Sequence, residues 1–60
     1  MREYKTIDLY RLTRAELLRL DHEMSVAIAQ LPEWHEDRTI ALINQRRIRR
    51  ELGQRDFTPH

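Results

Sequence analysis

Few side chains in this 60-residue chain are spaced for catalysis or metal binding. His22 and His35 each precede a glutamate, but Val26 and Thr39 occupy the positions where a zinc-binding His-Glu-x-x-His motif needs its second histidine. The chain has no cysteine, and its single glycine excludes a glycine-rich phosphate loop. We therefore expect no enzyme activity, no metal, no cofactor and no small-molecule substrate.

The densest charge in the chain is a run of arginines at positions 46, 47, 49 and 50. Such a run can bind nucleic acid, or it can complement the negative end of a helix dipole and pair locally, as Arg47 could with Glu51. We favour the second interpretation. The formal net charge is only +1, because both ends of the chain are basic and the middle is acidic. This layout can present a positive face to an anion, or pair subunits head to tail.

Two helices are expected to position these residues. The first should span about 13–30. Thr13 and Glu16 can form a capping box at its start, and Pro32 disfavours helical backbone at the residue before it. Its apolar positions have helical spacing: Leu17, Leu20, Met24, Ala27, Ile28 and Leu31.

The second helix should span about 33–52 and end at Gly53, a residue suited to a left-handed C-cap. Its start is left open between Pro32 and Thr39. Asn44 lies in its apolar stretch and is either exposed or a buried residue that fixes register across a dimer. A frayed tail, 54–60, completes a single domain over 1–60.

Residues 5–11 alternate in a way typical of a short β-strand. Ile7 and Leu9 would share one face, with Thr6, Asp8 and Tyr10 on the other. No second strand pattern exists in the chain, and a lone strand cannot satisfy its backbone. The strand would then pair with a second copy, and a chain of this length without disulfides favours a homodimer.

A competing interpretation makes Asp8 the cap of a short turn, with Leu9 and Leu12 under the first helix. The backbone of residues 5–11 discriminates between the two.

Strand, helix, helix over residues 4–52 resembles the ribbon-helix-helix family of bacterial and phage transcription regulators. The resemblance implies a mainly α fold with one N-terminal strand, in an intertwined homodimer whose two-stranded ribbon enters the major groove of double-stranded DNA. The chain would then be a sequence-specific DNA-binding regulator. It departs from the family in its longer first helix and in a turn without glycine.

The resemblance also implies roles for single residues. Base edges would be read by Thr6, Asp8 and Tyr10. Phosphates would be bound by Lys5, Arg11, Arg38 and Thr39. The shared dimer core would contain Ile7, Leu9, Leu17, Met24, Trp34, Ile40, Ile43 and Ile48.

The alternative is an α-helical hairpin that self-associates or binds a protein partner without DNA. The first part of the chain is similar, more loosely, to the oligomerising N-terminal segments of H-NS-type nucleoid-associated proteins, in which a leucine-led turn precedes a longer helix. No apolar run approaches the ~20 residues of a membrane span, so we expect a cytoplasmic protein.

Overall fold

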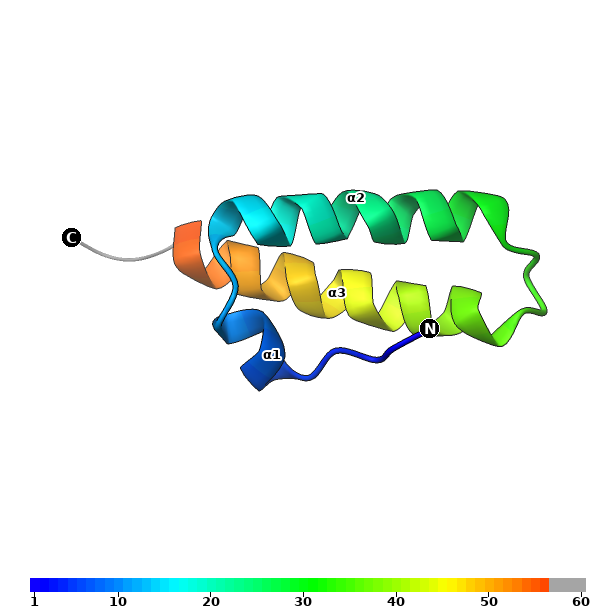
Figure 1. Cartoon of the computed structure of the whole chain (residues 1–60), viewed down its shortest axis with the longest axis horizontal. Coiled ribbons are helices and arrows are strands. Elements are labelled where there is room, and N and C mark those ends of the chain that lie inside the picture. Colours follow the sequence, from blue (N-terminus) through cyan, green and yellow to red (C-terminus); the bar gives the residue numbers. More distant parts are fainter. Residues whose placement is uncertain (57–60) are drawn as a thin grey trace.

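The computed structural model describes the backbone of residues 1–56 and the side chains of residues 1–55. Over this range it contains three α-helices and no β-strand: α1 (Thr6–Tyr10), α2 (Arg14–Gln30) and α3 (Glu36–Asp56). The predicted N-terminal strand, and with it the two-stranded ribbon, is therefore wrong. The α-helical hairpin considered as the alternative fits better: α2 and α3 run side by side, and α1 packs against α3 (Figure 1).

Interactions between residues close in sequence set both ends of helix α2. The predicted capping box is present, because the Thr13 hydroxyl accepts from the Glu16 amide at 3.1 Å and the Glu16 carboxylate accepts from the Thr13 amide at 3.0 Å. The helix ends at Gln30, and Leu31 before Pro32 is extended.

Helix α3 begins at Glu36, within the interval that the sequence left open. His35 lies just before it, and the Nδ1 atom of His35 accepts from the Asp37 amide at 3.0 Å, so an imidazole satisfies one of the free N–H groups of the first turn. The helix runs through Gly53 to Asp56, and Gly53 has no positive φ. Gly53 is therefore inside the helix and not its left-handed cap, and the predicted frayed tail is helical over 54–56; residues 57–60 lie outside the described residues.

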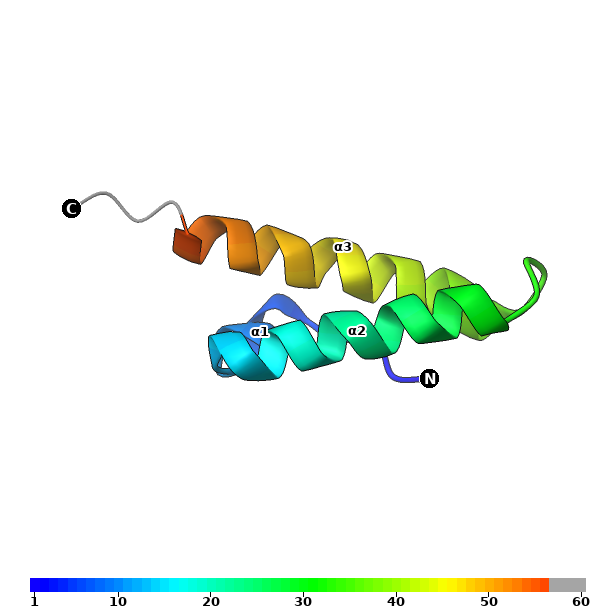
Figure 2. The same ribbon diagram turned by 90° about the horizontal axis from the view of Figure 1, so that it is seen from above.

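The core lies between the two long helices and beneath α1. Its buried apolar side chains come from every helix: Leu9, Leu17, Leu20, Met24, Ala41 and Ile48. The molecule is elongated, 44 × 18 × 15 Å, because the hairpin is only two helices wide (Figure 2). None of the helices in residues 1–56 is long and apolar enough to cross a membrane.

Residues 1–5 are extended and lie along α3. The Asn44 side chain, which is fully buried, accepts from the Tyr4 amide at 2.8 Å and donates to the Arg2 carbonyl at 2.8 Å. Arg47 donates to the Tyr4 carbonyl at 2.9 Å and pairs with Glu3 at 3.3 Å, not with Glu51 as the sequence suggested. Asn44 thus sets the register of this segment against its own α3.

Residues 6–10 are helical because both ends of this short helix have partners. The Asp8 carboxylate accepts from the Lys5 amide at 3.1 Å at the start. At the other end Arg55 donates to the carbonyls of Leu9 and Tyr10 at 3.2 and 3.0 Å. A five-residue helix is unstable alone, so the buried Leu9 and the guanidinium of Arg55 supply the stabilisation that the alternating pattern could not reveal.

Candidate functional site

The outer face of α2, opposite the core, is the most distinctive surface of the molecule. Its five outermost positions are exposed and lie within about 80° of arc on the helix. None is an acid, a lysine or an arginine: the set is Ala15, Leu18, His22, Val26 and Ala29. We call this set the α2 outer stripe. Because all five side chains are exposed, neither α1 nor α3 covers the stripe.

The spacing of the α2 outer stripe is symmetric. His22 stands at its centre, and Leu18 and Val26 lie four residues before and after it. Ala15 and Ala29 lie seven residues before and after. From either end, the stripe therefore begins with an alanine, continues with a larger apolar side chain and reaches His22. Leu18 is 48% exposed and Val26 is 37% exposed.

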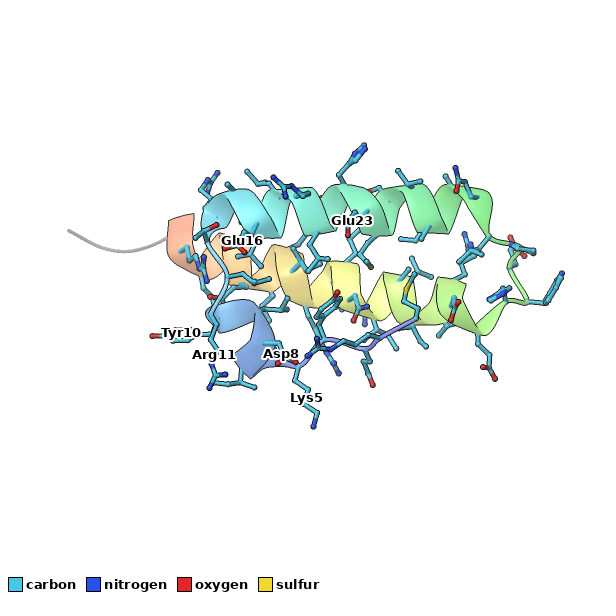
Figure 3. All side chains as sticks on the ribbon, viewed as in Figure 1. Lys5, Asp8, Tyr10, Arg11, Glu16 and Glu23 are labelled. Carbon is cyan, nitrogen blue, oxygen red and sulfur yellow. The ribbon has the colours of Figure 1, made fainter. Side chains whose placement is uncertain are left out.

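The two flanks of the stripe differ. On one side, Asp21 accepts from Arg49 at 3.1 Å and Ser25 accepts from Gln45 at 2.6 Å, so this flank is tied to α3. The other flank carries Arg19 and Glu23, both exposed. Figure 3 shows Glu23 on the near face of α2, together with Glu16 (Figure 3). One flank is thus closed by α3, and the other carries charges of both signs.

Opposite charges gather at the two ends of the hairpin. The turn between α2 and α3 carries Glu33, and the first turn of α3 adds Glu36 and Asp37. Asp37 accepts from the amino group of Met1 at 2.9 Å, and this hydrogen bond lowers the pKa of the carboxyl below its ordinary value. At the other end the exposed Arg11 and Arg14 flank the start of α2. We call the turn end of the hairpin the acidic tip and the opposite end the basic end.

The residues that the resemblance assigned to base reading do not share a face. Thr6 and Asp8 lie about 200° apart around a helix, and the Asp8 side chain is engaged by the Lys5 amide and by Arg2 at 3.3 Å. Tyr10 is 70% exposed at the end of α1. Figure 3 shows Lys5, Tyr10 and Arg11 pointing outward around α1, in separate directions.

The residues proposed for phosphate contacts are also spread out. Arg38 donates to the Ile28 carbonyl at 3.2 Å and so joins the first turn of α3 to the end of α2. Thr39 is exposed in the next position of α3. Lys5 and Arg11 lie at the other end of the molecule, so these four residues do not form one surface.

The residues predicted to build a dimer core occupy three environments. Leu9, Leu17, Met24 and Ile48 are buried within the single chain. Ile40 and Ile43 are half-buried. Ile7 is 54% exposed and Trp34, which stacks on His35 in the turn, is 82% exposed. Neither Ile7 nor Trp34 belongs to the core of this chain.

The α2 outer stripe is the surface that sequence reasoning missed. Its signal was present, because Ala15, His22 and Ala29 recur every seven residues, but the stronger core stripe hid it. Within the part of the chain that the structure describes, no three His, Asp or Glu side chains are grouped to hold a metal ion. Comparisons with protein-family models, with curated proteins and with solved structures find no match to this chain.

Proposed function

We propose that this chain is a self-association module, a helical hairpin that forms an antiparallel homodimer through the α2 outer stripe. The observation that carries the proposal is the symmetric spacing of the stripe about His22. A twofold interface must be self-complementary, because the same patch meets itself. When two copies of α2 run antiparallel with His22 on the axis, Leu18 of each copy faces Val26 of the other.

Side-chain size supports close contact between the two helices. Ala15 of one copy faces Ala29 of the other, so both ends of the contact are small and the helix axes can approach to about 8–10 Å. The larger Leu18 and Val26 lie about 12 Å apart along each helix. In the dimer they would fill the space on either side of the twofold axis. Their apolar surface would then be removed from water, which is favourable.

Charge supports the antiparallel direction. In an antiparallel helix pair each flank meets the same flank of the other copy. Arg19 of one copy then lies within about 3 Å, along the axis, of the level of Glu23 of the other. Arg11 precedes His22 by as many residues as Glu33 follows it. In the antiparallel pair the basic end of each copy therefore lies beside the acidic tip of the other. A parallel pair would bring like charges together.

The first experiment measures mass in solution by analytical ultracentrifugation over a wide range of concentrations. We expect a monomer–dimer equilibrium that the Leu18→Lys substitution shifts to monomer, because it places two charges in an apolar seam. Leu42→Lys is the matched control, since Leu42 is 44% exposed but lies on α3. A chain that stays monomeric at every concentration overturns the proposal, and so does equal weakening by both substitutions.

A cysteine test resolves the direction of pairing, because the natural chain has no cysteine. A His22→Cys variant should form a disulfide-linked dimer by itself, since position 22 lies on the axis. An Ala15→Cys variant should not link to itself, but should link to an Ala29→Cys variant when the two are mixed. Self-linking of Ala15→Cys would instead show parallel helices.

Charge reversal tests the flank. Arg19→Glu alone and Glu23→Arg alone should each weaken the dimer, and the double variant should regain affinity. A double variant no tighter than the single ones would remove this contact from the interface.

A further inference from the structure

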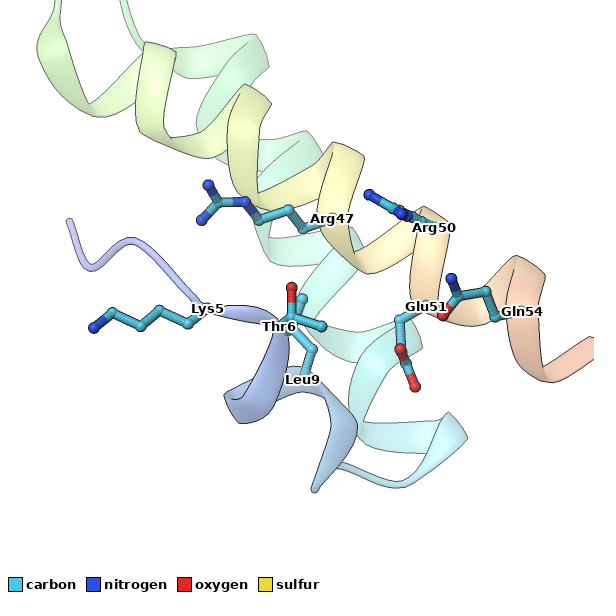
Figure 4. Close-up of a pocket in the computed structure, with 7 residues that line it drawn as sticks. All are labelled: Lys5, Thr6, Leu9, Arg47, Arg50, Glu51 and Gln54. Atoms are coloured by element: carbon cyan, nitrogen blue, oxygen red, sulfur yellow. The ribbon is translucent and has the colours of Figure 1, made fainter.

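A concave surface lies outside the α2 outer stripe and shares no residue with it. It is a cleft of about 450 Å³ between α1 and the C-terminal half of α3. Its lining is largely polar: Lys5, Thr6, Leu9, Arg47, Arg50, Glu51 and Gln54. Figure 4 shows Thr6 and Leu9 of α1 facing the α3 residues across this cleft (Figure 4). We call it the basic cleft.

The cations of the basic cleft exceed its anions. Three of the lining residues are positive and only Glu51 is negative. Glu51 is nearly buried and pairs with Arg55 at 3.0 Å, so its charge is already balanced. Among the described residues, no ion pair or side-chain hydrogen bond engages Lys5 or Arg50. A concave wall with unbalanced positive charge concentrates anions.

Apart from the Glu51 carboxylate, the polar side chains of the cleft can donate hydrogen bonds. Arg47 gives one nitrogen to the Tyr4 carbonyl and contacts Glu3, which is 52% exposed. Arg50 is exposed and keeps its planar set of donors, a set that matches two oxygens of a phosphate. The Thr6 hydroxyl and the Gln54 amide add neutral donors, and Leu9, 1% exposed, closes the inner end.

We propose that the basic cleft binds a phosphate group, with Arg50 as the main ligand and Lys5, Arg47 and Thr6 as supporting donors. This site is independent of the proposed dimer, because no residue of the cleft belongs to the α2 outer stripe. The same chemistry would recognise a phosphomonoester, as in a mononucleotide, or the phosphodiester of a nucleic-acid backbone.

The experiment is an amide NMR titration of the full chain with inorganic phosphate, then with a mononucleotide, then with a short mixed-sequence DNA duplex. We expect the amides of Thr6, Leu9 and Gln54 to shift together and to saturate, while those of the turn at 33–35 stay in place. Tighter binding of the nucleotide than of the duplex identifies a small phosphate ligand. Tighter binding of the duplex, falling steeply with salt, identifies a nucleic-acid backbone.

Two matched variants test the role of the cleft. Arg50→Gln should weaken binding about tenfold, the usual effect of removing one charge-assisted hydrogen bond. Arg46→Gln removes the same charge from the same helix outside the cleft, and should leave affinity within about twofold, because an exposed charge that makes no direct contact acts only at long range. Equal losses in the two variants would show diffuse attraction and overturn the proposal, as would amides that do not respond to any of the three ligands.

Discussion

The Asn44 side chain holds the backbone of Tyr4 across 40 residues of sequence, with Asn44 Oδ1 accepting from the Tyr4 amide at 2.8 Å. The Nδ2 atom of Asn44 donates to the Arg2 carbonyl at 2.8 Å and to the Met24 sulfur at 3.7 Å. The Asn44 side chain thus makes one hydrogen bond to residue 2 and one to residue 4. In a β-sheet, a neighbouring strand would make these two bonds. The N-terminal segment is extended as a strand would be, but its partner is a helix of its own chain.

Replacing Asn44 with Ala should lower the free energy of unfolding by about 2–3 kcal/mol, because it leaves the Tyr4 amide and the Arg2 carbonyl without their partners in a partly buried place. Urea unfolding measures the loss, and hydrogen exchange at the Tyr4 amide should accelerate with it. Arg46→Ala, an exposed neighbour on α3, should stay within about 0.5 kcal/mol of the natural chain. An unchanged urea midpoint in Asn44→Ala would contradict the structural role given to this residue.

Ile48 should be the more sensitive of the two central isoleucines of α3. Ile48 is 0% exposed, and Ile48→Ala should cost about 2–5 kcal/mol, because it removes apolar contacts and leaves a cavity. Ile43, which the sequence suggested as a core residue, is only half-buried and should lose less on the same substitution. A chain this small can unfold entirely in Ile48→Ala, so Ile48→Val, expected to cost about 0.5–1.5 kcal/mol, gives a measurable comparison. A larger loss in Ile43→Ala would reverse the assignment.

Stability should fall in acid, and Glu16 should contribute to the fall. The hydrogen bond from the Thr13 amide, and then that from the Thr13 hydroxyl, lower the pKa of Glu16 below its ordinary value of 4.5. A carboxyl with a lowered pKa in the folded state stabilises the fold above its ordinary pKa, and this contribution is lost as the pH falls through the lowered value. Melting temperature by circular dichroism should therefore drop below about pH 4.5. Glu16→Gln should make that drop shallower; a curve of the same steepness would exclude this cause.

Gly53 offers a simple route to a more stable chain. It lies inside α3, and a Cβ atom added there would have nothing within 4 Å. Gly53→Ala should raise the free energy of unfolding by about 1 kcal/mol, because alanine loses less backbone entropy in a helix and meets no steric obstacle. Thermal unfolding of the two chains measures the difference. A lower melting temperature in Gly53→Ala would mean that α3 does not continue past this position.

The sequence predicted the features whose causes are local. The reciprocal hydrogen bonds of Thr13 and Glu16 join residues three apart, and the break at Leu31 follows from the adjacent Pro32. The buried stripe at Leu17, Leu20 and Met24 repeats with the period of the helix itself. Each of these can be derived from a short window of residues without knowing what packs against it.

The features that were missed have distant causes. The alternation of residues 5–11 favoured a strand, but Arg55 binds the carbonyls of Leu9 and Tyr10 from 46 and 45 residues away and stabilises a helix there. The site was missed for a different reason. The α2 outer stripe has small residues at two of its five positions, and such residues carry little hydropathy signal even when their spacing is regular.

The contact between Asn44 and the N-terminal segment also orders events in time. A ribosome makes residues 1–5 some 40 residues before it makes their partner on α3. Helix α2 can form from its own local hydrogen bonds as soon as it emerges. The N-terminal segment cannot dock so early, because closing a loop of this length is entropically unfavourable until α2 and α3 have packed together. We therefore expect residues 1–5, although they are made before the hairpin, to reach their final place after it.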